Sequence, residues 1–351
     1  MNKTVVVKTL SDDEFNMYGD KLYADNDELT PFQNPNFINL IGVGTNIRKP
    51  IRHLLYKKQF LGVFRNGEPV LIAPLFIKKD PNQLLVVLAG HFSSATNLDF
   101  IYSKNVDWSD YDNLFSFIRN KFGKEIKVSL DRLYYKSRTY ILLKENVREI
   151  SEIESKCVSI KICDSRDEWY SGLSKSARQN IRTSYNRLNT DDIKMEFVPY
   201  FKELPAHNII LDETKLFSER ICEHLHYSES KKNIVKHALF LMKRNDKTLK
   251  ALNNQNEYIG GTVYLNGELA AYCQGLVRND GRAIIVRLSA NSKLSRYSPG
   301  GLLINEFMKE FEKHSSGVVF NEFDLARGQE KYKYTYGGVE YYNYSVEMIL
   351  K

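Results

Sequence analysis

Residues 282–338 read RAIIVRLSANSKLSRYSPGGLLINEFMKEFEKHSSGVVFNEFDLARGQEKYKYTYGG, and this stretch decides the fold of the chain. The aliphatic run 283–288 is long enough for a buried strand, and Ser298-Pro299-Gly300-Gly301 breaks the pattern. A helix is predicted next, because apolar residues recur at helical spacing at Leu302, Leu303, Phe307 and Phe311. A second strand follows at 318–325. The order strand, glycine turn, helix, strand is typical of an α/β fold.

The glycine turn is compatible with two interpretations. A helix that starts on Gly-Gly presents backbone N–H groups without obstruction, and such an end attracts phosphate because unpaired donors and the positive end of the helix dipole coincide there. The same residues also make an ordinary turn and N-cap. Asp324 ends the second strand, and ionisable residues beyond such a strand lie where open α/β sheets keep their ligand crevice.

Several short motifs in this stretch resemble the signature of the two-lobed GNAT-like acyltransferases. They are Ser298-Pro299-Gly300 with Leu303, Phe323-Asp324 with Gly328, and Tyr332-Lys333. The superfamily includes acetyltransferases associated with exopolysaccharide and cellulose biosynthesis, and the Fem aminoacyl-tRNA ligases of peptidoglycan synthesis. Residues 173–182, LSKSARQNIR, are similar to the Ser/Lys/Arg helix that opens the second lobe in that superfamily. The resemblance is diffuse from about residue 30 to 160 and sharper from about 170 to 338.

The resemblance implies an α/β (α+β) protein of tandem GNAT-like lobes, each a mixed, mostly antiparallel sheet flanked by helices. The polar segment 145–156 lacks an apolar face, so the boundary between the lobes is expected there. Residues 1–150 would form an acceptor-binding lobe and residues 151–351 an acyl-donor-binding lobe. The last 15 or so residues could return to the first lobe.

An internal repeat agrees with two lobes. VFRNGE at 63–68 is echoed by VYLNGE at 263–268, and each copy lies between two apolar runs. Asn-Gly is the favoured pair for a two-residue hairpin turn, so both copies predict a β-hairpin. The order downstream also repeats, with a helix (108–122; 302–314) and then a short strand (126–130; 318–325). We infer an internal duplication.

Composition and charge narrow the function only partly. The net charge is +7 over 351 residues, which favours an anionic ligand but does not separate a nucleotide, a nucleotide sugar, a glycan and RNA. No Lys/Arg block is dense enough to indicate DNA binding. No apolar run approaches 18 residues, so neither a membrane span nor a signal peptide is predicted, and a cytoplasmic protein is expected. The four cysteines show no metal-ligand spacing, so no metal is expected.

The basic helix predicted around 175–185 also has two interpretations. Lys175, Arg178 and Arg182 share one face at 3.6 residues per turn. This face could simply be solvated. Alternatively, Arg178 or Arg182 binds an anionic acceptor, because a planar guanidinium grips phosphate or carboxylate well. A further helix is predicted over 203–244, without the long heptad-patterned insertion that many Fem ligases carry.

The resemblance also implies how an acyl donor would be held. In GNAT-like folds the strand before the glycine loop parts from its neighbour and its backbone binds the pantetheine arm, which here would be 286–290. Acetyl-CoA, or another acyl-CoA, is the implied co-substrate. Its expected contacts are Leu288, Ser289, Arg296, Ser298, Gly300, Gly301 and Leu302.

Attack of an amine on a thioester needs an uncharged nitrogen, donors for the developing oxyanion and a proton for the leaving thiolate. Backbone N–H groups of the parted strand, Tyr332 and Lys333 are the candidate donors, and Asp324 could orient the acceptor or take its proton. Asp324 could equally be a loop cap, and Lys333 a surface lysine.

Three functions follow from these patterns. The first is an acyl-CoA-dependent N-acyltransferase, an N-acetyltransferase acting on an amino group of a sugar, a sugar nucleotide or a related surface-polysaccharide precursor. The second is a Fem-like ligase that takes its acyl group from aminoacyl-tRNA, and only this function makes tRNA a partner. The third is a non-catalytic protein that binds a glycan or another partner. The sequence leaves the acceptor and the oligomeric state open.

Overall fold

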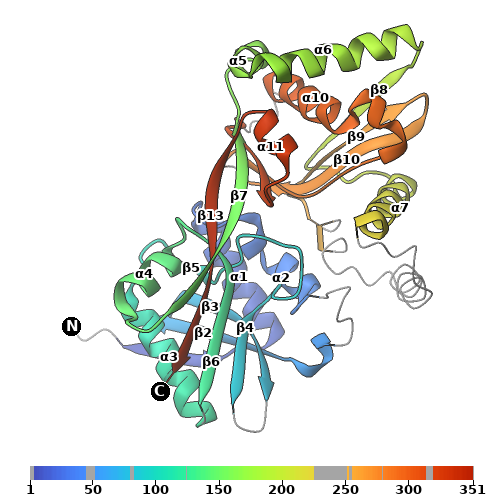
Figure 1. Cartoon of the computed structure of the whole chain (residues 1–351). Helices are drawn as coiled ribbons and strands as arrows, with labels where there is room; N and C mark the ends of the chain where they lie inside the picture. The colour runs from blue at the N-terminus through green and yellow to red at the C-terminus, as the bar shows by residue number, and fades with distance from the viewer. Residues whose placement is uncertain are drawn as a thin grey trace. The chain divides into compact units, whose positions relative to one another are not determined.

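The computed structural model describes residues 4–44, 52–79, 83–123, 125–224, 251–252, 255–278, 280–313 and 319–350. The chain forms two compact units (Figure 1). The first unit consists of Met1–Lys156, Lys247–Ala251 and Tyr341–Lys351, and the second of Cys157–Asp246 and Leu252–Glu340. Neither unit is therefore continuous in sequence.

The first unit is a mixed sheet with helices. Its elements in chain order are β1 (Val5–Thr9), α1 (Asp12–Asp25), η1 (Pro31–Gln33), α2 (Pro35–Ile41), η2 (Arg52–Leu55), β2 (Lys57–Arg65), β3 (Glu68–Lys79), β4 (Leu84–Leu88), β5 (Ile101–Tyr102), α3 (Trp108–Phe122), β6 (Ile126–Tyr134) and α4 (Arg138–Asn146). The strands follow the order β1-β2-β3-β4-β6, and β4 and β6 are parallel. The other ladders, β1 with β2, β2 with β3 and β3 with β4, are antiparallel.

The second unit repeats this plan. The chain enters it through β7 (Ser151–Lys161) and continues with α5 (Arg166–Gly172), α6 (Lys175–Thr190), β8 (Met195–Phe201), α7 (His207–His224), β9 (Tyr258–Leu265), β10 (Glu268–Val277), β11 (Arg282–Ala290), η4 (Ser292–Tyr297), α10 (Pro299–Lys313), β12 (Glu322–Arg327), α11 (Lys331–Thr335) and β13 (Gly338–Leu350). Its sheet has the order β7-β12-β11-β10-β9-β8, with β11 and β12 parallel.

From β1 in the first unit and from β8 in the second, the main elements follow one order: a strand, one or more helical segments, a three-stranded antiparallel meander, a helix, a parallel strand and a further helix. This confirms the prediction of two similar lobes, each a mixed, mostly antiparallel sheet flanked by helices. The helices predicted at 108–122 and 302–314 are α3 and α10, and His314 lies outside the described residues. The helix predicted at 203–244 is present as α7 as far as His224, and 225–244 lie outside the described residues.

The two Asn-Gly turns are built alike. Asn66 and Gly67 have φ of 53° and 87°, and Asn266 and Gly267 have φ of 50° and 80°. The Asn66 N–H donates to the Thr4 carbonyl at 2.9 Å, and the Asn66 side-chain oxygen accepts from the Thr4 N–H. Asn266 makes the same pair of bonds with Lys194, both at 2.8 Å. Each turn thus fastens its hairpin to the residue just before the neighbouring strand, β1 in the first unit and β8 in the second, which supports the inferred duplication.

The strands that close the two sheets lie next to the unit boundaries in the sequence. Residues Asn343–Leu350 of β13 pair with β6 and complete the first sheet. Residues Cys157–Lys161 of β7, which directly follow the first unit's main segment, pair with β12 in the second. The first sheet is therefore closed by a strand that comes after the second unit in the chain, and the second sheet by a strand that comes directly after the first unit's main segment.

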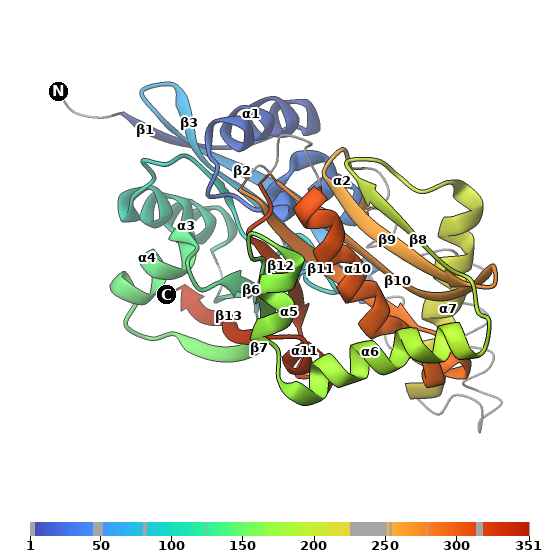
Figure 2. The ribbon, with the colours of Figure 1, turned by 90° about the horizontal axis from the view of Figure 1, so that it is seen from above.

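Helices cover both faces of the second unit's sheet, with α6 and α10 on one face and α7 on the other (Figures 1 and 2). The apolar stripe of α10 packs on the strands through Phe307, whose ring lies 5.2 Å from that of Phe323. Gly261 permits this packing, because a Cβ there would lie 2.6 Å from the Phe307 ring. Across the described ranges, no helix has the length and apolarity needed to cross a membrane.

Candidate functional site

The two parallel strands of the second unit separate early. β11 and β12 pair over Arg282–Ile284 and Glu322–Asp324, and β11 then runs on to Ala290. A bulge marks the separation, because Ile285 faces Gly275 and Arg287 faces Gln274, which leaves Val286 as an extra residue. The edge of β11 beyond this point presents backbone donors and acceptors towards the gap. The structure thus confirms the parted strand that the resemblance implied.

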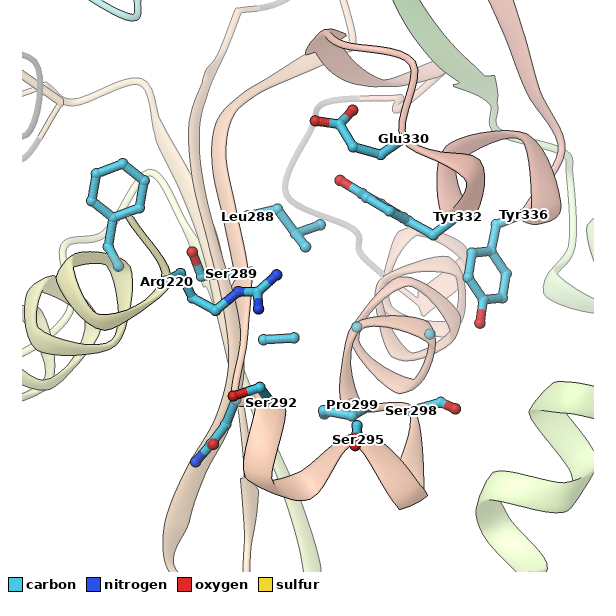
Figure 3. A pocket seen from close by; sticks show the side chains of 15 residues that line it. Arg220, Leu288, Ser289, Ser292, Ser295, Ser298, Pro299, Glu330, Tyr332 and Tyr336 are labelled. Carbon is cyan, nitrogen blue, oxygen red and sulfur yellow. The ribbon is translucent and has the colours of Figure 1, made fainter. Parts of the chain in front are cut away.

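A pocket of about 540 Å³ begins where the strands part (Figure 3). Its lining comes from α7, the end of β11, η4, the start of α10, and the segment around α11. The lining residues are Phe217, Arg220, Leu288, Ser289, Ala290, Asn291, Ser292, Ser295, Ser298, Pro299, Gly300, Gly301, Glu330, Tyr332 and Tyr336.

The start of α10 offers fewer free donors than the sequence predicted. Ser298 has a left-handed backbone with φ of 50°, and its carbonyl accepts from the N–H groups of Gly301 at 2.9 Å and Leu302 at 3.1 Å. Pro299 has no N–H. Only the Gly300 N–H at this turn is without a hydrogen-bond partner among the described residues. An anion bound here would therefore interact with one free amide, the positive end of the helix dipole and the neighbouring serine hydroxyls.

The two glycines of this turn serve different purposes. A Cβ on Gly301 would lie 1.9 Å from the Tyr336 hydroxyl oxygen, so packing excludes any side chain there. A Cβ on Gly300 would meet only the Cβ of Ala290 at 3.8 Å, which is ordinary contact. Packing therefore requires glycine at 301, whereas at 300 the missing side chain leaves space in the pocket.

Tyr332 forms part of the pocket wall, and Figure 3 shows its hydroxyl directed towards β11 and Leu288. Burial, with a further contribution from the Glu330 carboxylate, raises the pKa of Tyr332 well above its ordinary value. The hydroxyl therefore stays protonated at neutral pH and can donate a proton or a hydrogen bond.

Lys333, the other predicted donor, is turned away from the pocket. Its side chain is 3% exposed, and Nζ donates to the carbonyls of Leu325 at 2.9 Å and Arg327 at 3.0 Å. Nζ also pairs with the Glu330 carboxylate at 3.1 Å. The ammonium binds carbonyls at the end of β12, and these contacts explain why Lys333 is buried without any catalytic role.

Asp324 also makes structural contacts within the second unit. It is fully buried, accepts from the Arg282 guanidinium at 2.5 Å, and accepts from the Ala326 N–H at 2.8 Å. It does not belong to the pocket lining. Its position matches the loop-cap interpretation and not the predicted role on the acceptor.

Five of the seven predicted coenzyme contacts line the pocket: Leu288, Ser289, Ser298, Gly300 and Gly301. The other two do not. Leu302 is 1% exposed and belongs to the hydrophobic core. Arg296 is directed to the end of α6, where Nε and Nη2 donate to the Asp191 carboxylate at 3.0 and 3.2 Å.

The predicted acceptor-binding arginines lie on α6, outside this lining. Arg178 Nη1 donates to the carbonyls of Ser171 and Leu173, both at 2.7 Å, and so completes the end of α5. Arg182 is exposed. A role of Arg182 with an acceptor stays a prediction.

Sequence patterns missed seven lining residues: Phe217, Arg220, Asn291, Ser292, Ser295, Glu330 and Tyr336. Arg220 brings a cation to the pocket and pairs with Glu223 at 2.8 Å, and Ser292 Oγ donates to the same carboxylate at 2.8 Å. Helical periodicity could have placed Phe217 and Arg220 on one side of α7, but not against η4. Glu330 and Tyr336 flank the quoted Tyr332-Lys333 motif. No group of three potential metal ligands occurs in the part of the chain that the structure describes.

Comparisons with known proteins agree with this geometry. Residues 240–334 match the family model of an acetyltransferase (GNAT) domain. A conserved protein of unknown function from Bacteroides thetaiotaomicron has a similar structure, with 16% identity, a TM-score of 0.53, and coverage of 99% of this chain and 100% of that one. The C-terminal domain of a protein from Agrobacterium fabrum, provisionally assigned as a lysylphosphatidylglycerol synthetase, gives 10% identity and a TM-score of 0.54, with 96% and 92% coverage.

A tandem GNAT protein from the clavulanic acid biosynthesis pathway gives 9% identity and a TM-score of 0.47, over 99% of each chain. A search of curated proteins found no significant match. Residues 240–334, which match the acetyltransferase (GNAT) domain, contain the parted strands β11 and β12 and most of the residues that line the pocket.

Proposed function

We propose that this protein is an acyl-CoA-dependent N-acyltransferase that binds its donor in the pocket of the second unit. The observation that carries the proposal is the position of the pocket. It opens where β11 leaves β12, with the start of α10 at one end and Tyr332 in its wall. An extended pantetheine chain can pair with the edge of β11, while phosphates meet the Gly300 N–H, the serine hydroxyls and Arg220.

The reaction follows from this placement. An uncharged amine attacks the thioester carbonyl carbon, a new C–N bond forms, and the C–S bond breaks. N–H groups on the open edge of β11 stabilise the oxyanion, and Tyr332 gives its proton to the leaving thiolate. The amine loses one proton, which returns to the Tyr332 phenolate through solvent, so the products are an amide and the free thiol of coenzyme A. Holding the two substrates in line supplies much of the rate.

For the acceptor, we propose an amino group on a sugar or sugar nucleotide used for a surface polysaccharide. The resemblance to polysaccharide-associated acetyltransferases supports this choice, and the net charge of +7 suits an anionic acceptor such as a nucleotide sugar. An acetyl group is the simplest donor for such a reaction. The test is mass spectrometry of amino sugars and amino-sugar nucleotides incubated with acetyl-CoA and the protein.

Donor binding is tested by calorimetric titration of coenzyme A into the wild type and the Gly300→Asp variant. Residue 300 has room for a side chain, and a carboxylate there would face the donor's phosphates. We expect affinity to fall by about 100-fold or more, because like charges placed together cost several kcal/mol. Gly172→Asp is the matched control, since a Cβ at 172 meets nothing within 4 Å and the residue lies outside the pocket.

Deacylated tRNA belongs in the same titrations. Salt-sensitive tRNA binding without coenzyme A binding would replace the proposal with a Fem-like ligase, because tRNA affinity depends steeply on salt. Equal affinity of Gly300→Asp and wild type for coenzyme A would remove the proposed phosphate site.

A further inference from the structure

The parallel strand of each unit carries a bulge at the same place. In β6, Arg132 is the second of two residues that face Ser345, and in β12 Ala326 is the second of two that face Val158. Both second residues have left-handed backbones, with φ of 58° at Arg132 and 51° at Ala326. Residues other than glycine rarely adopt this conformation, so its recurrence identifies Arg132 and Ala326 as equivalent positions of the two repeats.

In the first unit, the side chain at this position ties the bulge to the loop after β4. Arg132 is buried, and its Nη1 donates to the carbonyls of Ser93 and Ala95, both at 2.6 Å. Its Nη2 donates to the carbonyls of Gly90 at 2.8 Å and His91 at 2.9 Å. The guanidinium thus joins the two segments that flank the parting of β4 and β6.

In the second unit, the corresponding loop is Asn291–Ser298, which follows β11. Four of its residues, Asn291, Ser292, Ser295 and Ser298, line the pocket of about 540 Å³. The equivalent bulge residue is Ala326, whose methyl group cannot bridge to that loop. A guanidinium therefore joins the two segments in the first unit, whereas in the second unit the bulge residue has no side chain to make this bridge and the loop after β11 borders a pocket.

We propose that this bulge residue decides which unit takes the acyl donor. Arg132 closes the opening in the first unit, Ala326 leaves it open in the second, and each chain binds a single coenzyme A thioester. Opening the first unit would strip four buried carbonyls of a charged donor, which is costly because unsatisfied buried polar groups lose their full solvation. This inference rests on the proposed function and names the residue that makes the two units unequal.

Binding stoichiometry tests the inference. In calorimetric titrations with coenzyme A, the wild type is expected to bind one equivalent per chain and Gly300→Asp none. Two equivalents in the wild type, of which Gly300→Asp keeps one, would show an open first-unit site and overturn the inference while leaving the proposed function intact. No binding by the wild type would refute the proposed function, and this inference would fall with it.

A second variant places an arginine at position 326 of the second unit, as at position 132 of the first. Ala326→Arg should weaken coenzyme A binding by at least about 10-fold, because an arginine at the position equivalent to Arg132 is expected to bridge to the loop after its own β11. Ala326→Asn is the matched control, since asparagine tolerates the left-handed backbone but is too short to span the gap. A folded Ala326→Arg protein with wild-type affinity would overturn the inference. If melting curves show that this variant is unfolded, the stoichiometries of the wild type and Gly300→Asp decide.

Discussion

The hydroxyl oxygen of Tyr336 lies where a side chain on Gly301 would begin, 1.9 Å from the position of a Cβ atom. The start of α10 and the segment after α11 are therefore packed together at this point. This contact shapes one wall of the pocket, since both residues line it.

Gly301→Ala should destabilise the second unit by about 2 kcal/mol or more, because overpacking forces the phenol or the helix to move. Gly300→Ala should change the free energy of unfolding by less than about 1 kcal/mol, since its Cβ makes only ordinary contact. Urea unfolding of both variants checks the contrast. Equal stability of the two would mean that Tyr336 does not pack against residue 301.

Tyr332→Phe should lower kcat by about 100-fold while the affinity for coenzyme A changes by less than about 2-fold. The phenylalanine keeps the apolar wall but cannot protonate the thiolate. Because burial raises the pKa of Tyr332, the wild-type rate should not fall between pH 7 and about 10 through loss of this proton. Steady-state rates across this range, together with calorimetry, measure both effects. An unchanged kcat would remove Tyr332 from the chemistry.

Glu213 should make the second unit less stable as pH rises. Its carboxylate is fully buried, accepting from Thr262 at 2.9 Å and Gln274 at 2.7 Å, and burial raises its pKa from 4.5 to about 7. The folded protein therefore holds a proton that the unfolded chain has lost. This contribution is full below about pH 4.5 and disappears as pH rises through about 7. It amounts to about 3 kcal/mol.

Glu213→Gln should flatten this dependence, because glutamine is neutral throughout. Gln274 can satisfy the new side chain by turning its amide, since its own Oε1 has no hydrogen-bond partner among the residues that the structure describes. Urea unfolding of the wild type and Glu213→Gln at pH 4.5, 6 and 8 makes the comparison. Parallel pH profiles for the two proteins would contradict the prediction.

Removing residues 341–351 should open the first unit's sheet selectively. β13 supplies the strand that pairs with β6, and Asn343 Nδ2 donates to Thr96 Oγ1 at 2.8 Å and Asn97 Oδ1 at 2.7 Å. Hydrogen–deuterium exchange should become faster in β6 and in the loop 90–97, and less so in β9–β11. Uniform acceleration over both units would show that they unfold as one.

Much of the fold was predictable from the sequence because its signals are local. The Asn66-Gly67 and Asn266-Gly267 turns require positive φ, and the helical spacing of Leu303, Phe307 and Phe311 defines a buried face without knowledge of its partner. The repeat of these signals was enough to predict two similar lobes. The pocket residues next to the glycine turn were predictable for the same reason.

The partners of long polar side chains were not predictable. Asp324, Lys333, Arg296 and Arg178 all looked available for a ligand, yet the structure pairs each with a group of its own unit. Their residue types are suited to ligand binding, but a charged side chain pairs with whichever group the fold brings within reach, and a buried one such as Asp324 or Lys333 must do so. Arg220 and Glu330 show the converse: no sequence pattern marked them for a ligand, yet the fold brings both to the pocket.

The sequence by itself determined the secondary structure, the repeat and the position of the glycine turn, because periodicity and backbone preferences act over a few neighbouring residues. Only the tertiary structure decided that β7 and β13 close the sheets and which side chains face the pocket. It also decided that Arg132 bridges to the loop after β4 in the first unit, whereas Ala326 makes no such bridge in the second. These features depend on contacts between residues far apart in the chain. Such contacts are set by how the packed elements meet and not by any local pattern.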